Sequence, residues 1–470
     1  MLVQLYNTLT RRRDAIRPLQ PGQVRMYTCG PTVYRYVQIG NLRTFLLADL
    51  LRRTLELEGI SVRQIKNITD VGHLTDEMFD RGEDKMLVAA RLERKTPEEI
   101  AAFYTQAYLT DERSLNILPA EVFPRASQHI DEMIRLVERL LSRGHAYLSG
   151  SAVYFDVASQ PEYGRLSGNS QESLWPGRRM ALDRHKRNPG DFVLWNIAAS
   201  RRIMKWPSPW GEGYPGWHVE CSAMSLKYLG EQFDIHTGGV DNIFPHHEDE
   251  IAQGLGAFGK VPAQHWAHGA HLTVDGRRMA KSTGNVVRIA DLVEHGIEPL
   301  AFRYLCLTTR YRARINFTWA AAEAAAHALD RLRRSVDPGP HATVLGEDAV
   351  ELDEAFRAAL LADLDTPSAL VSLERMVGSR IPAAEKRALL RRWDRVLGLD
   401  LAPPAHQEAE ALDPEEEAWL NARARARDRR DYAEADRLRG MLAAHGVELA
   451  DSPDGTRWRR AQVTDSSHRE

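Results

Sequence analysis

Three absences narrow the class of protein before any motif is considered. The chain has only three cysteines, Cys29, Cys221 and Cys306, which cannot form a paired disulfide framework of the kind that stabilises small secreted domains. No stretch approaches the roughly eighteen consecutive apolar residues of a membrane-spanning helix. The N-terminal segment MLVQLYNTLTRRRD lacks the apolar core and cleavage site of a secretory signal. We therefore expect a protein of the reducing cytoplasm that does not enter a membrane.

The chain also lacks a strong net charge. Its 62 basic and 65 acidic residues give −3 at pH 7, so any nucleic-acid surface must be a local basic patch. Lysine is scarce, with 9 among the 62 basic residues, which makes the position of each lysine informative. The 43% hydrophobic and 27% charged residues are typical of a globular protein. The length predicts about two to four folded units.

The order of the first elements predicts a nucleotide-binding sheet. Residues 25–30, RMYTCG, have the pattern of a short strand that runs into a turn, and leucines at helical spacing predict an amphipathic helix over 42–57. A second buried strand is predicted over 62–68. Strand, glycine-containing turn, helix and strand form the βαβ unit of a parallel sheet.

Later segments divide the chain further. The pattern is helical from 96 to 146, β-like over 152–157, and typical of a sheet again from 233 to 285. Beyond Phe317 the chain is helical and rich in alanine. The pair Pro403-Pro404 and the acidic run after it predict a linker before a last pair of helices.

The first candidate for a chemical site is the segment CGPTVYRYVQIGN, residues 29–41. Gly40 lies at the start of the predicted helix, where a triphosphate can approach backbone N–H groups at the positive helix end. A glycine before a helix more often serves only as a turn or cap. This motif alone leaves both interpretations open.

The second candidate is RRMAKSTGN, residues 277–285. Lys281 lies beside two arginines and Ser282 in a glycine-containing loop, where it could neutralise the charge that develops on a leaving pyrophosphate. A solvated basic loop is an equally open interpretation of this segment alone.

The third candidate is the acidic and histidine-rich segment FPHHEDE. His246 and Glu250 are four residues apart, so on a helix they share one face and can bind one ion, whereas His247 is rotated by about 100° and is expected to point elsewhere. Cys29 and Cys221 would complete a Cys–Cys–His–Glu metal set. Sequence alone leaves open whether such scattered residues meet, because buried cysteines commonly act as small hydrophobic residues.

In this order along one chain, the motifs resemble those of the class I aminoacyl-tRNA synthetases, and the match narrows to the cysteinyl enzymes. The resemblance covers nearly the whole chain, and an ordered set of this size is far more specific than any one motif. The segments that carry it are LYNTLTRRRD, MYTCGPTVY, IGNLRT, NITDV, DFVLWN, SPWGEGYPGWHVECSAMS, FDIHTGGVDNIFPHHEDEIAQ, KSTGN and SPDGTRWR.

The resemblance implies a cysteine–tRNA ligase, which activates L-cysteine with ATP and Mg²⁺ and transfers it to tRNA(Cys). A pocket selects poorly by shape between a thiol and a hydroxyl, but zinc prefers sulfur. The family's substrate residues correspond here to Cys29, Thr69 and Trp217, with a packed core tryptophan as the alternative for Trp217. One zinc ion per subunit is implied at Cys29, Cys221, His246 and Glu250.

The resemblance also implies a nucleotide site. Small residues in this site would let the backbone approach the nucleoside. Asp241 would accept a hydrogen bond from a ribose hydroxyl. The two glycines before Asp241 could instead serve only a tight turn. The implied catalytic residues are Gln38, Gly40, Asn41 and Lys281. The implied ATP contacts are Gly40, Asn41, His236, Gly238, Gly239, Asp241, Lys281 and Ser282.

The chain departs from the family's pattern in both signatures. Gln38 replaces a histidine that stabilises the phosphates in the transition state, and Arg35 replaces the usual acidic residue. The second signature, Lys-Met-Ser-Lys-Ser in the family, has Arg278 and Ala280 here and retains Lys281. Because glutamine still donates a neutral hydrogen bond, we expect activation to be reduced or differently tuned, not lost.

The fold implied is α/β, with a Rossmann-type parallel-sheet catalytic domain, an inserted connective domain, an α-helical bundle and a small C-terminal module. The last two would contact the anticodon side of tRNA through arginines, in a cytoplasmic monomer. The predicted domains are 1–120 and 206–316 for the catalytic halves, 121–205 for the insert, 317–402 for the bundle and 411–465 for the module.

Two other functions stay open from the sequence. A related enzyme could attach cysteine to a small amine, but such an acceptor needs no long helical C-terminus. A non-catalytic RNA-binding or regulatory protein would agree with Gln38, but would need neither the metal set nor Lys281.

Overall fold

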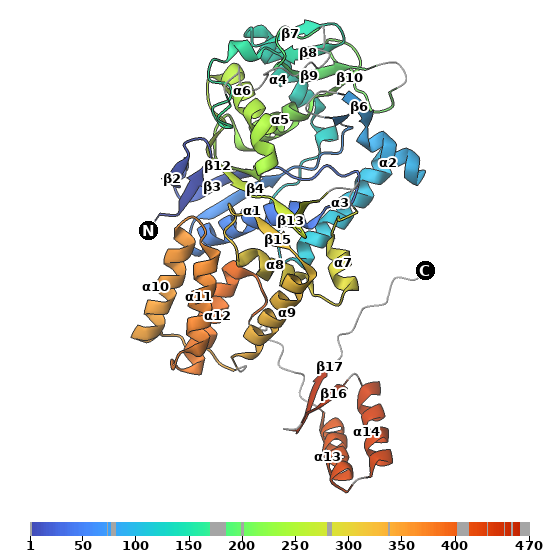
Figure 1. Ribbon diagram of the computed structural model, residues 1–470, viewed down its shortest axis with the longest axis vertical. Coiled ribbons are helices and arrows are strands. Elements are labelled where there is room, and N and C mark those ends of the chain that lie inside the picture. Colours follow the sequence, from blue (N-terminus) through green and yellow to red (C-terminus); the bar gives the residue numbers. More distant parts are fainter. Residues whose placement is uncertain are drawn as a thin grey trace. The chain divides into compact units, whose positions relative to one another are not determined.

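The computed structural model (Figure 1) describes most of the chain in two compact units, Met1–Ala402 and Pro403–Glu470. No helix in the part that it describes is long and apolar enough to cross a membrane. The described residues are 2–72, 74–76, 81–169, 185–198, 202–279, 284–336, 339–401, 413–429, 431–445, 447–452 and 455–460.

A four-stranded parallel sheet forms the centre of the first unit. Its strand order is β12-β11-β3-β4, and every neighbouring pair is parallel. β11 is buried along nearly its whole length, as expected for a parallel strand covered on both faces. The sheet confirms the predicted α/β class, and its strands are β3 (Gln23–Thr28), β4 (Ser61–Lys66), β11 (Phe233–Gly239) and β12 (Ala263–Gly269).

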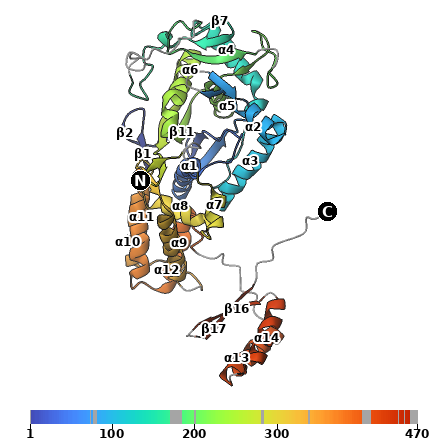
Figure 2. The same cartoon turned by 45° about the vertical axis from the view of Figure 1, so that its right-hand side comes forward.

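Three helices cover this sheet. Figures 1 and 2 show α1 (Ile39–Leu57) on one face and α5 (Trp217–Leu229) and α6 (Glu248–Phe258) on the other. α1 connects β3 to β4, and α6 connects β11 to β12. One connection leads from β3 to one edge of the sheet, and the other leads from β11 to the opposite edge. The direction in which the strands are added therefore switches between β3 and β11. Ligands bind at such a switch point, outside the carboxyl ends of the strands.

The predicted insert is an antiparallel sheet of order β10-β9-β8-β7, packed beside α4 (Ile130–Ser142). Its last strand, β10, pairs with β9 and lies beyond the predicted boundary at residue 205, because that boundary fell in a loop inside the sheet. The strands are β7 (Ala146–Ser149), β8 (Ala152–Phe155), β9 (Phe192–Ile197) and β10 (Gly213–Pro215).

Shorter elements complete the sheet half of the first unit. A three-stranded sheet of order β14-β13-β15 brings the start of the second signature next to the central sheet. The elements are β1 (Gln4–Asn7), β2 (Arg12–Ala15), β5 (Leu74–Asp76), β6 (Arg81–Asp84), α2 (Lys85–Glu93), α3 (Pro97–Ser114), β13 (Leu272–Val274), β14 (Arg277–Arg278), α7 (Ile289–Glu294), α8 (Pro299–Leu307) and β15 (Ile315–Phe317).

Four further helices close the first unit, and the second unit has its own small core. α13 begins at a capping box in which Asp413 and Glu416 exchange hydrogen bonds with each other's backbone N–H groups. The helices are α9 (Trp319–Arg334), α10 (Glu347–Leu361), α11 (Thr366–Gly378) and α12 (Ala383–Leu397), and the second unit holds α13 (Pro414–Asp428), α14 (Tyr432–Ala444), β16 (Val447–Ser452) and β17 (Gly455–Arg460).

A buried ionic cluster joins the sheet half to the helical half. Asp49 of α1 accepts hydrogen bonds from Arg303 Nη2 of α8 at 2.6 Å and from Arg53 Nε at 2.9 Å. Arg303 is fully buried and also donates to the carbonyl of Leu397 at the end of α12. Three helices therefore meet at one carboxylate.

Replacing Asp49 with alanine would leave two buried guanidinium groups without their carboxylate. We expect the free energy of unfolding of the first unit to fall by about 3–5 kcal/mol, measured by urea denaturation. The control Asp330→Ala, which breaks an exposed pair with Arg334, should cost less than about 1 kcal/mol. Equal losses in the two variants would contradict the structural role of the cluster.

Candidate active site

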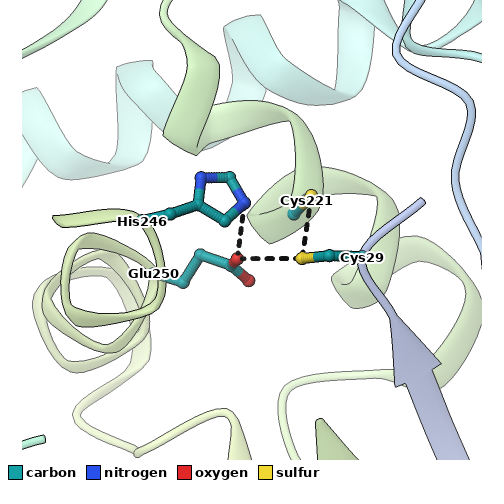
Figure 3. Close-up of side chains that lie close together, drawn as sticks. All are labelled: Cys29, Cys221, His246 and Glu250. Carbon is teal, nitrogen blue, oxygen red and sulfur yellow. Dashed lines mark hydrogen bonds and ion pairs between the residues drawn. The ribbon is translucent and has the colours of Figure 1, made fainter. Parts of the chain in front are cut away.

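Four side chains from three parts of the chain meet at the switch point. Cys29 follows the end of β3, Cys221 lies in α5, His246 precedes α6, and Glu250 lies in its first turn. All four are buried, and their ligand atoms lie within 4.8 Å of one another. Figure 3 shows the two thiols, the imidazole and the carboxylate pointing toward one another. The structure thus brings together the four residues predicted to bind a metal.

The distances suit a single small ion. The sulfur atoms of Cys29 and Cys221 are 3.9 Å apart, and both cysteines are free. His246 Nε2 lies 3.1 Å from Glu250 Oε1, which lies 4.0 Å from Cys29 Sγ. Two sulfur atoms, one nitrogen and one oxygen form a donor set typical of tetrahedral zinc. These residues fit the metal that the sequence predicts.

The buried groups of the cluster differ in the direction in which their pKa values are shifted. Burial and the neighbouring Cys221 raise the pKa of the Cys29 thiol well above its usual value. The hydrogen bond from Cys29 lowers the pKa of Cys221 to about 7. Burial acts to lower the pKa of His246, but the negative charges of Cys221 and Glu250 prevail and raise it to about 9. One thiol therefore ionises readily, and a bound cation would favour loss of the remaining protons.

A second row of histidines supports these ligands from behind. His236 Nε2 lies 3.0 Å from Glu250 Oε2, which leaves Oε1 directed toward His246. His247 Nε2 lies 3.2 Å from Cys29 Sγ, and its Nδ1 lies 2.8 Å from His268 Nε2. Burial lowers the pKa of His247 well below its usual value and that of His268 to about 3, so both rings stay neutral. Contacts of this kind fix the orientation of metal ligands.

The expectation that His247 points away from the cluster is wrong. The segment before α6 is kinked, because Phe244 has the extended backbone angles φ −136° and ψ 132°, and the regular helix begins only at Glu248. Side-chain directions on a regular α-helix therefore do not hold for the residues before Glu248. Cys29, His236, His247 and Glu250 in fact form a second group with metal-binding distances. We favour the first group because it contains both thiols, and zinc prefers sulfur.

A cavity of about 380 Å³ opens beside Cys29 at the carboxyl ends of β3, β11 and β12. Gln38, Gly40 and Asn41 line it at the start of α1, where Asn41 Oδ1 accepts a hydrogen bond from the Gln38 backbone N–H. Gly239 and Asp241 line the same cavity from the end of β11 and the loop after it. The predicted catalytic and nucleotide residues at these five positions therefore share one cavity.

Trp217 also lines the cavity and is only half-buried, so it is not a packed core residue. Its ring stacks on His246 with centroids 4.3 Å apart. This contact places an aromatic ring on the cavity lining beside the cluster.

Three predicted contacts lie behind the cavity lining. His236 is fully buried against Glu250. The His247 ring packs directly against Gly238, where an added Cβ would lie only 2.7 Å from His247 Cε1 and would clash with it. The Thr69 hydroxyl is buried and donates to Glu220. These residues have partners within the protein that support the site, and their implied contacts to cysteine and ATP stay predictions.

Two predicted residues, Lys281 and Ser282, lie outside the described residues. The described lining adds others that the sequence analysis did not select. Asn242 Oδ1 accepts from the Gly239 N–H at 3.0 Å, and His271 Nδ1 lies 3.3 Å from Asp241 Oδ2. Asn242 follows directly after the predicted GGVD loop, so extending that motif by one residue would have found it. No motif marked His271.

Comparison with known proteins decides the family. Residues 15–327 match the model of the class I (C) tRNA synthetase catalytic domain, and residues 409–459 match that of the cysteinyl-tRNA ligase anticodon-binding domain. A cysteine–tRNA ligase of Thermus thermophilus is 45% identical, over 97% of this chain and 98% of that protein. Cysteine–tRNA ligase 1 of Burkholderia lata is 44% identical, over 97% of each chain.

The chain belongs to the cysteine–tRNA ligases. This confirms the resemblance on which the sequence analysis relied.

The fold agrees with this family. Methionyl-tRNA synthetase of Mycobacterium tuberculosis with methionyl-adenylate has a TM-score of 0.54 at 14% identity, covering 80% of this chain and 90% of that chain. The LeuRS–tRNA–LeuAMS complex of Agrobacterium radiobacter K84 has a TM-score of 0.56 at 13% identity, with coverages of 82% and 84%. These matches give the family and the fold. They do not explain why thiol, imidazole and carboxylate groups are buried together beside the cavity of this cysteine–tRNA ligase.

The geometry of the four ligands predicts how single substitutions change zinc affinity. Cys221→Ser removes a soft ligand and should weaken zinc binding by more than about 100-fold, beyond the roughly 10–100-fold typical of losing an outer-shell partner. His236→Gln, which disturbs only the support of Glu250, should fall within that smaller range. Affinity should decrease as pH falls below about 9, where His246 takes up a proton, and decrease more steeply below about 7, where Cys221 does so as well.

Competition with a zinc-specific chromophoric chelator measures these affinities. Cys306→Ser is the matched control, because Cys306 is a buried thiol of α8 outside the cluster. If Cys306→Ser lowered zinc affinity as much as Cys221→Ser, the assignment of the metal to this cluster would be wrong.

Proposed function

We propose that this chain activates L-cysteine with ATP and Mg²⁺ to cysteinyl-adenylate and transfers the cysteinyl group to tRNA(Cys). The observation that carries this proposal is the meeting of Cys29, Cys221, His246 and Glu250 beside a cavity at the switch point. A nucleotide bound at the start of α1 would place its α-phosphate in the same cavity as a substrate side chain near Cys29.

We assign selection of cysteine to the metal cluster. Zinc bound there would supply a soft Lewis-acid position that prefers a thiolate to a hydroxyl. Glu250 is held between His236 and His246, so its orientation is fixed before substrate arrives. Trp217 covers the cluster on the cavity side and limits the size of the side chain that enters.

We assign ATP binding to the start of α1 and the facing loop. Gly40 has no side chain, and a Cβ there would lie 2.7 Å from Met279 Cε of the second signature. The N–H groups of Ile39 and Asn41 donate to backbone carbonyls, so we assign the contact to the phosphates to the Gly40 N–H and to the positive end of the helix. Gln38 donates a neutral hydrogen bond, Asp241 serves the ribose, and Lys281 and Ser282 contact the phosphates from the second signature.

We infer that tRNA(Cys) is recognised at the anticodon by the second unit, to which the anticodon-binding model matches. The turn between α13 and α14 is rich in arginine, and such residues neutralise RNA phosphates. A paralogue that joins cysteine to a small amine would have no use for this unit.

We also infer a cytoplasmic monomer. The cluster requires Cys29 and Cys221 as free thiols, and their sulfur atoms lie near enough for oxidation to inactivate the site. A reducing compartment keeps such thiols free.

The experiment that tests the function is charging of bulk bacterial tRNA with labelled cysteine or serine. Shape alone discriminates by about 10–200-fold between such similar side chains. We expect preference for cysteine well above this range, and its loss after zinc is removed by a chelator and its return after zinc is added back. Glu250→Ala should reduce charging with cysteine far more than Glu231→Ala, a control at an exposed ion pair.

Pyrophosphate exchange separates the possible failures. Exchange with cysteine but no charging of tRNA would indicate a different acceptor. No exchange with cysteine by the zinc-loaded protein would refute the proposed reaction.

A further inference from the structure

Two segments of the chain bring charged side chains to the cavity lining, and only one of them balances its charge. On the wall formed by the loop after β11 and the start of the second signature, Arg278 Nη2 lies 3.1 Å from Asp241 Oδ1. His271 Nδ1 lies 3.3 Å from the other carboxylate oxygen. Asp241 therefore has a partner at both oxygens, and the ion pair leaves this wall without net charge when His271 is neutral.

Arg35 lines the cavity from the other segment, between β3 and α1. It is half-buried, and its guanidinium carbon lies 5.0 Å from the ring centroid of Tyr34. Within the part of the chain that the structure describes, no carboxylate pairs with it. The wall beside α1 thus carries one uncompensated positive charge, held in place by an aromatic ring.

The start of α1 adds to this positive field. Its first turn contains no acidic residue, and Gly40 and Asn41 line the same cavity as Arg35. The N-terminal end of a nineteen-residue helix carries a partial positive charge, although the N–H groups of Ile39 and Asn41 already donate to the carbonyls of Val287 and Gln38. An arginine presents a planar set of donors that matches phosphate oxygens. The fixed positive charge, the helix end and the cavity all favour a polyphosphate at this wall.

We propose that Arg35 binds the β- and γ-phosphates of ATP and stabilises pyrophosphate as it leaves. This inference rests on the proposed function, which supplies the reaction. A carboxylate oxygen of cysteine bonds to the α-phosphorus while the bond from that phosphorus to the α,β-bridging oxygen breaks. The electron pair of the broken bond leaves on pyrophosphate, and no proton moves. Negative charge accumulates on pyrophosphate, where a fixed cation stabilises the transition state.

Arg35 would then supply the charge that Gln38 cannot. Gln38 lines the cavity three residues later and donates only a neutral hydrogen bond. A charge-assisted hydrogen bond to phosphate is roughly twice as strong as a neutral one. Arg35 and Gln38 are also the two positions where this segment departs from the family's pattern, and the change at Arg35 adds the positive charge.

Binding of magnesium pyrophosphate to the zinc-loaded protein, followed by calorimetry, tests this assignment directly. Arg35→Gln should weaken pyrophosphate binding by about 10- to 100-fold, and Arg35→Lys by much less. Arg35→Met keeps an alkyl stem over Tyr34 and should lose as much as Arg35→Gln, which separates charge from packing. Adenosine, which has no phosphate, should bind all variants equally. Arg334→Gln, at an exposed helical pair, is the control.

Pyrophosphate exchange gives the kinetic test. Arg35→Gln should raise KM for ATP and lower kcat, with KM for cysteine unchanged. Gln38→His returns a group that can carry charge, so it should raise exchange more in the Arg35→Gln background than in the wild-type chain. Equal effects of Gln38→His in the two backgrounds would count against the shared role.

The outcomes separate this inference from the proposed function. Unchanged pyrophosphate affinity in Arg35→Gln and Arg35→Met would overturn the role of Arg35, as would an equal loss of adenosine affinity. If pyrophosphate binding depends on Arg35 but the wild-type chain shows no exchange with cysteine, the phosphate site stands and the proposed reaction fails.

Discussion

The parallel pairing of β3 with β11 is the constraint on which the site depends. Thr28 lies opposite Thr237, and the Cys29 N–H donates to the carbonyl of Thr237 at 3.1 Å. This register places the first residue after β3 beside the segment that leaves β11. Because α6 follows that segment, His246 and Glu250 reach Cys29 across more than two hundred residues of sequence. A shift by one residue would turn Cys29 to the other face of the sheet.

The sequence selected the four residues that the structure brings together as a candidate metal site, but only part of their surroundings. The ordered motifs identified Cys29 and Cys221 as partners although they lie in different elements. A resemblance to a family indicates which residues meet in three dimensions, whereas their spacing in the sequence does not. The interpretation of His247 failed since it assumed regular α-helix through a segment that contains Pro245. Sequence periodicity cannot reveal the extended residue Phe244 that interrupts the segment, whereas the backbone shows it directly.

Thr69 shows a second limit of inference from motifs. Asn67 Oδ1 accepts from the N–H of Gly30, Asn67 Nδ2 donates to Thr69, and Thr69 donates to Glu220. This chain of hydrogen bonds links the neighbour of Cys29 to the neighbour of Cys221. Thr69 therefore has a structural role beside its implied contact to substrate, because it helps to fix the separation of Cys29 and Cys221. Side-chain partners decide between these roles, and sequence does not give them.

The first turn of α6 explains why three consecutive acidic residues are buried at this place. Glu248 accepts from the backbone N–H groups of residues 166 and 167, and Asp249 accepts from the Tyr163 hydroxyl, so two of the acids hold the insert. Glu250 faces the metal cluster. All three lie where a helix N-terminus favours negative charge. One helical turn thus fixes the insert and presents a metal ligand, so a change that loosens the insert would also disturb the orientation of Glu250. Coupling of this kind follows from rigid helical geometry and requires no movement of the sheet.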